Sequence, residues 1–144
     1  MKLTQISILI SNEPNALVRI CEILKNNNVD ITTLTLADST DYGILRLIIR
    51  DWEVAKAALE KENLIVKTTD VIAISVPNQV GGLFSILDCL GKAGINIEYM
   101  YGFSSAADDN CVQVLRLDDT DRGIEVLEKA NIGVLKKAEL FKKA

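Results

Sequence analysis

The sequence predicts an α+β fold in which two tandem βαββαβ units pack about a pseudo-twofold axis. The first observation is an internal repeat, because one constant shift along the chain carries Ile8 to Ile74. The same shift carries Leu17 to Leu83. The second observation is that each copy opens with apolar residues at every second position and continues with apolar residues at every third or fourth. These periods are typical of a strand followed by an amphipathic helix.

The repeat also predicts the domain organisation. In the later part of each copy the shift is two residues longer and carries Asn63 to Asn131, so the additional residues belong to a loop. We expect one domain at residues 1–69 and a second at residues 70–144. A unit of this size buries only about 60% of its unfolded surface. We therefore expect the two copies to pack against each other.

Each element of the first copy has a recognisable pattern. Alternating apolar residues predict a strand at 6–10, and an apolar stripe from Leu17 to Leu24, which includes Cys21, predicts a helix. Asp51 is placed to cap a second helix. Runs rich in Val, Ile, Leu and Thr predict the other strands. These strands cover residues 29–36, 43–50 and 64–67.

The second copy repeats this order after the short linker 68–70. An apolar stripe from Leu83 to Leu90 marks its first helix, and Asp119 is placed to cap its second. The predicted strands cover residues 71–76, 95–102, 111–117 and 133–138, and the second helix covers 120–130. The order βαββαβ, present twice, predicts a ferredoxin-like α+β sandwich in each copy.

Composition excludes several classes of function. The net charge of −4 provides no general field for phosphate, so nucleic acid is not an expected partner. The chain has no histidine, the commonest general base and a frequent metal ligand, and we expect no catalytic residues, metal or cofactor. Three cysteines without a C-x-x-C pair favour a reducing compartment. No long apolar segment predicts a signal peptide or membrane span, so we expect a cytoplasmic protein without a membrane partner.

Residues that tolerate positive φ occur at matching positions of the two copies. Asn28 aligns with Gly94 just after the first helix, where a left-handed residue ends a helix. Asn15 aligns with Gly81 just before that helix. A tight turn there leaves backbone N–H groups at the positive end of the helix, which binds carboxylates or phosphates. Small residues next in sequence, Ala16 and Gly82, allow a ligand to approach this backbone closely, whereas the spacing by itself favours an ordinary turn between a strand and a helix.

These loops resemble those of a known family. Pro14-Asn15-Ala16-Leu17 and Val80-Gly81-Gly82-Leu83 resemble the P-G-x-L loop of ACT domains. Gly94-Ile95-Asn96-Ile97 resembles the G-I-N-I motif at the second strand of that family, and Asn28-Val29-Asp30-Ile31 is a looser copy. The resemblance covers essentially the whole chain as two ACT units in tandem.

The resemblance implies a ligand held by the first loop of one unit and by second-strand residues near the interface between units. In the first copy the implied residues are Asn12, Glu13, Asn15, Ala16, Leu17, Asp30, Ile31 and Thr32. In the second copy they are Asn78, Gln79, Gly81, Gly82, Leu83, Asn96, Ile97 and Glu98. The first loop lacks the glycine of the family. Glu98, or Asp30 in the other site, is the carboxylate expected to face a ligand ammonium.

ACT domains are regulatory modules that bind amino acids or similar metabolites, so the resemblance implies an amino-acid sensor or an allosteric regulatory subunit without catalytic activity. No catalytic domain accompanies the two copies in this sequence, and we expect its output to pass through oligomerisation, with a homodimer favoured, or through a partner metabolic enzyme. The alternative is a structural or assembly module that pairs through sheet edges without binding a ligand.

Overall fold

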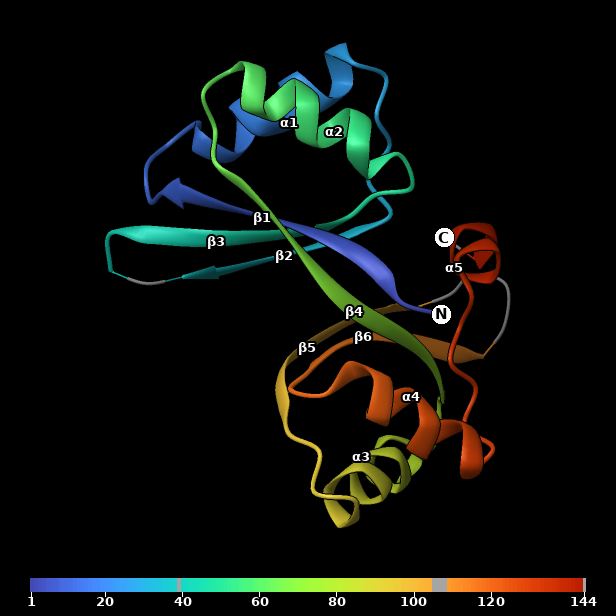
Figure 1. Cartoon of the computed structure of the whole chain (residues 1–144). Coiled ribbons are helices and arrows are strands. Elements are labelled where there is room, and N and C mark those ends of the chain that lie inside the picture. Colours follow the sequence, from blue (N-terminus) through green and yellow to red (C-terminus); the bar gives the residue numbers. More distant parts are fainter. Residues whose placement is uncertain (39, 105–108, 144) are drawn as a thin grey trace. The chain divides into compact units, whose positions relative to one another are not determined.

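The computed structural model describes residues 1–38, 40–104 and 109–143, and the chain divides into two compact units. The first unit is Thr4–Thr69. The second unit is Asp70–Ala144 together with Met1–Leu3. Figure 1 labels the helices and strands of both units. Among the described residues, no helix combines the length and the apolar character that crossing a membrane requires.

The first unit has the predicted βαββαβ order. Its elements are β1 (Leu3–Ser11), α1 (Ala16–Asn26), β2 (Thr33–Asp38), β3 (Tyr42–Ile48), α2 (Trp52–Lys61) and the start of β4 (Val66–Pro77). The strands lie in the order β2-β3-β1-β4, and β3 is antiparallel to both β1 and β2. Both helices cover the same face of this sheet (Figure 1).

The core of the first unit follows from the two periods of the sequence. Ile6, Ile8 and Ile10 alternate along β1 and point to the helix-covered face, where they are buried. Ile20 and Leu24 are 1% exposed and come from one stripe of α1. Cys21 is exposed, contrary to its expected place in that stripe. The helix therefore buries a narrower stripe than the sequence pattern suggests.

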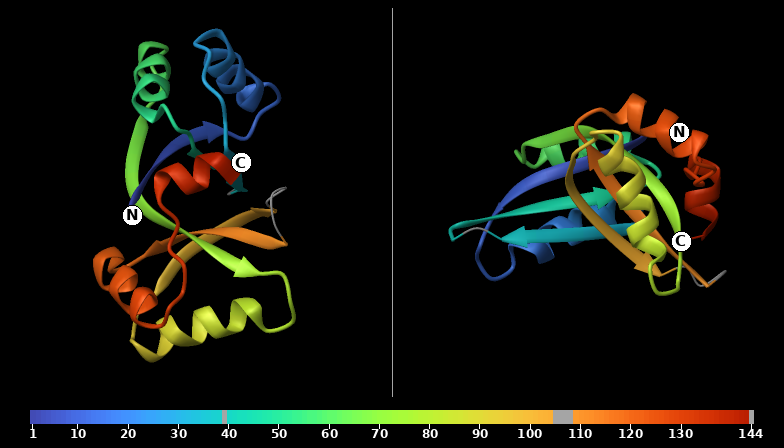
Figure 2. Two further views of the ribbon diagram at one scale, coloured as in Figure 1. Left: turned by 90° about the vertical axis from the view of Figure 1, so that its right-hand side faces the viewer. Right: turned by 90° about the horizontal axis from the view of Figure 1, so that it is seen from below.

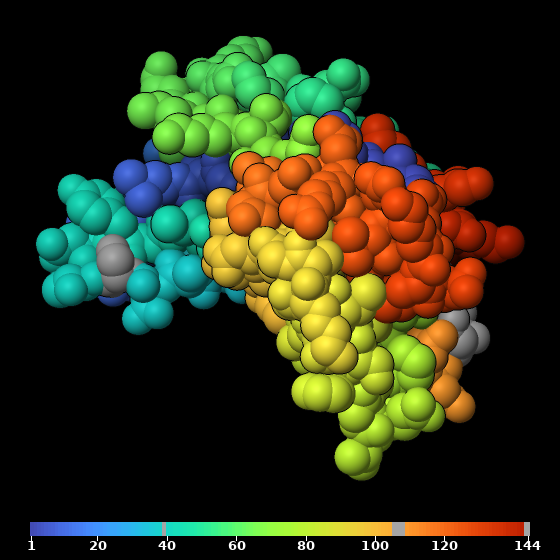
Figure 3. Space-filling model, turned by 60° about the horizontal axis from the view of Figure 1, so that its bottom comes forward, coloured from blue at the N-terminus to red at the C-terminus, as the bar shows by residue number. Residues whose placement is uncertain are grey.

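The second unit repeats the architecture. Its elements are β4, α3 (Gly82–Lys92), β5 (Ile97–Ser104), β6 (Asn110–Leu117), α4 (Thr120–Lys129) and α5 (Lys137–Lys143). The strands lie in the order β4-β6-β5, with antiparallel pairing on both sides of β6. Helices α3 and α4 of this unit lie side by side (Figures 2 and 3). Its core contains Ile74, Leu90 and Leu115.

Two sequence predictions about the strands are wrong. The expected linker 68–70 lies inside β4, which is one continuous strand of 12 residues. No Gly or Pro interrupts this segment before Pro77, so nothing in the backbone ends the strand earlier. The expected strand at 133–138 is reduced to a single bridge between Val134 and Ile74. Helix α5 begins instead, where a Glu139 carboxylate oxygen accepts a hydrogen bond of 2.8 Å from the Lys136 backbone N–H.

The predicted helix ends are largely confirmed. Asn28 and Gly94 have φ values of 55° and 72° and follow the first helix of each copy. Two further residues, Asn63 and Asn131, have φ values of 63° and 57° after the second helices. Left-handed residues therefore end all four helices of the repeat. The predicted caps differ, because Asp119 accepts a hydrogen bond from the Arg122 N–H at 3.1 Å whereas Asp51 makes no side-chain cap.

Candidate functional site

In the first unit the loop between β1 and α1 leaves backbone donors without partners. Asn15 is left-handed, with φ 68° and ψ −3°, as its alignment with a glycine predicts. The Ala16 N–H reaches the Glu13 carbonyl at 3.4 Å. Among the described residues, the N–H groups of Leu17 and Val18 have no acceptor. These donors and the helix dipole make a local site for negative charge.

In the second unit the matching loop has the same left-handed residue but folds more tightly. Gly81 has φ 81° and ψ −2°, and the Gly82 N–H donates to the Gln79 carbonyl at 3.1 Å. The Gln79 N–H also donates to the Pro77 carbonyl at 2.8 Å. A Cβ at position 82 would collide with that Pro77 carbonyl oxygen. The Pro77 carbonyl oxygen of the same loop therefore lies where a larger residue at position 82 would place its Cβ, so the loop requires glycine there.

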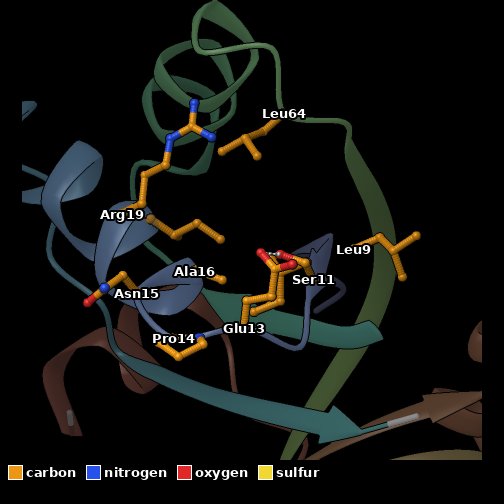
Figure 4. Close-up of a pocket in the computed structure, with 10 residues that line it drawn as sticks. Leu9, Ser11, Glu13, Pro14, Asn15, Ala16, Arg19 and Leu64 are labelled. Carbon is orange, nitrogen blue, oxygen red and sulfur yellow. Dashed lines mark hydrogen bonds between the residues drawn. The ribbon is translucent and has the colours of Figure 1, made fainter. Parts of the chain in front are cut away.

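Each loop borders a cavity that lies within its own unit. The cavity of the first unit measures about 370 Å³ and lies between the end of β1, the start of α1 and the segment before β4 (Figure 4). It is lined by Leu9, Ile10, Ser11, Glu13, Pro14, Asn15, Ala16, Arg19, Ile20 and Leu64. A smaller cavity of about 80 Å³ adjoins the same loop and is lined by residues that include Asn12 and Leu17.

Most of the residues that line the cavity of the second unit match, under the repeat shift, residues that line the first cavity. It measures about 240 Å³ and is lined by Ser75, Pro77, Gln79, Gly82, Ser85, Ile86, Asn131, Ile132 and Gly133. The repeat shift carries Glu13 to Gln79 and Ala16 to Gly82, and both members of each pair line their cavity. The fold therefore builds this cavity twice, once in each unit.

The two cavities differ in charge. Glu13 and Arg19 line the first cavity, whereas Gln79 and Ser85 stand at the same positions of the second, whose lining has no charged residue. The Arg19 side chain donates to the Glu62 carbonyl at 3.1 Å. Ser11 donates weakly to the Glu13 carboxylate at 3.4 Å. Figure 4 shows Arg19 and Leu64 on one side of the cavity, and Glu13 and Ser11 on the other.

The strand residues implied by the family resemblance lie apart from these cavities. None of Asp30, Ile31, Thr32, Asn96, Ile97 and Glu98 lines any of the three. Glu98 forms an ion pair with Arg116 at 3.3 Å, and the Asn96 N–H donates to Asp118 at 3.0 Å. Gly81 and Leu83 border the second loop without lining its cavity, and the Asn78 N–H donates to the Asp109 carbonyl at 3.2 Å.

Sequence reasoning missed the charged and apolar partners of the first loop. Arg19 belongs to the exposed side of α1, and Leu64 precedes β4 far along the chain. The two helices agree at Leu17 and Leu83, Ile20 and Ile86, and Leu24 and Leu90, and differ at their other positions, Arg19 and Ser85 included. No feature of the sequence therefore singles out Arg19.

The clear pKa shifts among the described residues lie outside both cavities. A hydrogen bond to Asp121 raises the pKa of Lys2, and a hydrogen bond to Asp88 raises the pKa of Lys92. A hydrogen bond from Lys129 lowers the pKa of the Glu125 carboxyl. All three side chains are exposed at the surface, so these shifts reflect surface pairing. No three His, Cys, Asp or Glu side chains gather as metal ligands in the part of the chain that the structure describes.

Comparison with known proteins identifies the architecture. A family model for the ACT domain pair matches residues 1–144. The crystal structure of a protein from Bacteroides thetaiotaomicron is 36% identical, with a TM-score of 0.91, and the match covers 99% of this chain and 97% of that one. A search of curated proteins finds no match.

More distant solved structures share the fold. The regulatory subunit of aspartate kinase from Thermus thermophilus, in a ligand-free form, is 12% identical with a TM-score of 0.64; the match covers 88% of this chain and 91% of that one. Aspartate kinase from Synechocystis is 19% identical with a TM-score of 0.60, and 93% of this chain matches 26% of that longer one. The same paired fold therefore occurs as a separate subunit and within a longer chain.

Proposed function

Because the chain belongs to the ACT domain pair family, we propose that it is a regulatory protein that binds an amino acid at the loops preceding α1 and α3 and catalyses no reaction. The residues proposed to hold the ligand are those of the two loops, together with the second-strand residues that the family resemblance implies. The ligand would bias the protein toward one of two states and so control a partner.

The observation that carries this proposal is the left-handed residue before each first helix. Asn15 and Gly81 have almost the same backbone conformation although their side chains differ. In the first loop this conformation leaves the Leu17 and Val18 N–H groups unbonded among the described residues, beside a cavity. Such donors at a helix N-terminus suit the carboxylate of an amino acid.

The proposed output is an effect on a metabolic enzyme. The fold is shared with a regulatory subunit of aspartate kinase, and this supports a subunit that acts through a partner. The two proteins are compared by their fold, whereas function depends on the residues of the site. Pull-down from cell extract with and without the bound amino acid identifies such a partner, which should be a metabolic enzyme whose activity changes with the amino acid.

The absence of catalysis is proposed from the side chains present. The sequence contains no histidine, and the cysteines are free in the described structure. The groups that line the cavities include no nucleophile paired with a base. We propose a cytoplasmic location on the same composition, since unpaired cysteines suit a reducing compartment.

A thermal-shift screen against the twenty amino acids tests the proposal. A ligand present at a hundred times its Kd stabilises the folded state by about 2.7 kcal/mol, which raises the unfolding temperature measurably. At least one amino acid should produce this shift. A flat screen would contradict amino-acid binding and favour the alternative function.

That alternative is an assembly module, and the edge strand of the first unit favours it. β2 lies at the end of its sheet, and its Leu34 and Leu36 side chains are 39% and 46% exposed. Exposed apolar residues on an edge strand promote pairing with another chain. We propose a homodimer under either function. Sedimentation over micromolar concentrations tests it, and a monomer throughout would contradict it.

A further inference from the structure

We propose that the cavity of the first unit binds a free aliphatic amino acid, with Arg19 holding the carboxylate and Glu13 holding the ammonium. This inference rests on the proposed function and assigns it to one copy and one ligand class. It depends on side chains that the family resemblance did not single out, and on a cavity that lies within a single unit.

In the described part of the chain, neither charged group has an ion-pair partner. Arg19 spends one N–H on the Glu62 carbonyl, and its other guanidinium N–H groups have no partner among the described residues. The Glu13 carboxylate accepts only a long bond from Ser11 there, and no cation pairs with it. A positive and a negative group at one cavity match a ligand with both charges.

Arg19 is also positioned in advance. Its bond to the Glu62 carbonyl ties the side chain to the end of α2, so part of the entropy that binding would cost is already lost on folding. The guanidinium presents donors in a planar arrangement suited to a carboxylate. Figure 4 shows this group and the Glu13 carboxylate on opposite sides of the cavity, so a ligand can lie between them.

Apart from Ser11 and Asn15, the remaining residues that line the cavity are apolar. Ala16, Ile20 and Leu64 contribute to the lining, and Ile20 is only 1% exposed at its base. Burying a Leu-sized side chain there removes apolar surface from water, which stabilises a complex. A volume of about 370 Å³ lies within the range of small-molecule sites. An aliphatic side chain therefore fits this wall better than a charged or strongly polar one.

The second unit shows that the fold does not require these charges. Its cavity has Gln79 and Ser85 at the same positions, and the Ser85 hydroxyl donates to the Gly81 carbonyl at 3.2 Å within its own helix. The second unit forms the same left-handed turn without either charged group. The shared fold therefore does not depend on the charges of Glu13 and Arg19. This is what a role in ligand binding predicts.

The test compares three probes by calorimetry: L-leucine, its deaminated analogue 4-methylpentanoate, and its decarboxylated analogue 3-methylbutan-1-amine. Arg19→Ser and Glu13→Gln are each measured against the wild type. Arg19→Ser should weaken L-leucine binding at least tenfold and leave the affinity for the amine unchanged. Glu13→Gln should weaken L-leucine at least tenfold and leave the affinity for 4-methylpentanoate unchanged or higher. A purely structural role of either residue would weaken both kinds of probe together.

Matched controls remove the same charges elsewhere. Arg122→Ser and Glu128→Gln change exposed residues of α4 and should bind L-leucine as the wild type does. Arg19→Gln retains a donor for the Glu62 carbonyl, so it should fold like the wild type yet still lose L-leucine affinity. Unfolding temperatures without ligand show whether each variant is folded.

The outcomes separate this inference from the proposed function. If L-leucine binds the wild type and both cavity variants equally, the first cavity is not the site although amino-acid binding stands. If only amino acids without an aliphatic side chain bind, the ligand class proposed here is wrong and the function again stands. If none of the twenty binds, both proposals fail.

Discussion

The loops before α1 and α3 have the same backbone conformation, but the cavities beside them are lined by different residues. Both place a left-handed residue before the first helix of the copy, Asn15 in one and Gly81 in the other. The cavity beside the first loop has Glu13 and Arg19, whereas the one beside the second has only neutral residues. The two copies share this backbone conformation although the residues differ. The residues that line the cavities differ between the copies, so a ligand would distinguish the copies there.

The second loop requires glycine at a position where the first loop has alanine. Ala16 occupies the position of Gly82, and the first loop accommodates its Cβ. In the second loop the Pro77 carbonyl turns inward to accept from Gln79 and occupies that space. Matching positions of the two copies are therefore suited to substitutions that compare them directly.

The largest expected effect tests whether the two cores contribute equally. Leu24 and Leu90 occupy matching positions and are 1% and 0% exposed. Changing either to Ala removes buried methyl groups and leaves a cavity, which lowers the free energy of unfolding by about 2–5 kcal/mol. Urea denaturation measures both losses. A loss in only one variant would show that the cores differ as the cavities do.

The next effect concerns the tight second loop. Gly82→Ala places a Cβ against the Pro77 carbonyl, and we expect a loss of about 1–3 kcal/mol because the backbone must shift. The matched change Ala16→Gly should cost only about 0.5–1 kcal/mol, through backbone entropy. Thermal unfolding of both variants gives the comparison. Equal losses would mean that the two loops tolerate the same side chains.

A third comparison measures the cost of the left-handed backbone conformation separately from the effect of packing contacts. Gly81→Ala meets no atom within 4 Å, so its expected cost of about 1–2 kcal/mol comes from φ alone. Asn15→Gly keeps the left-handed conformation accessible and should change stability by less than about 0.5 kcal/mol. Chemical denaturation measures the two variants. A neutral Gly81→Ala would indicate that the second loop can leave this conformation.

The smallest effect distinguishes the two helix caps. Asp119→Ala removes the hydrogen bond to the Arg122 N–H and should cost about 1 kcal/mol. Asp51→Ala removes no side-chain cap and should stay within about 0.5 kcal/mol. Both variants can be measured by thermal unfolding at one pH. A larger effect at Asp51 than at Asp119 would contradict the cap assignment.

Much of the fold was predictable because its signals are local. Alternation in β1 and the stripe of α1 each lie within a dozen residues, and both elements form where the pattern predicts. The errors lie where neighbouring sequence carries no signal. Nothing between Val66 and Pro77 indicates that one strand serves both copies, and the bridge at Val134 depends on Ile74, which is distant in sequence.

The candidate site also has features that were predictable from the sequence and features that were not. The loops and their positive φ values were predictable from Asn15 and Gly81, since few residue types adopt that conformation. The repeat also showed that the loop is built twice. These features depend on consecutive residues, and so the sequence by itself determined them.

Only the tertiary structure decided what surrounds those loops. It brings Leu64 to the same cavity as Glu13 and Arg19, although these residues are far apart along the chain. It also places the Pro77 carbonyl where a side chain at position 82 would stand. Such contacts depend on distances between separate elements, and these are set by how helices pack on the sheet. A residue pattern read along one chain does not contain them.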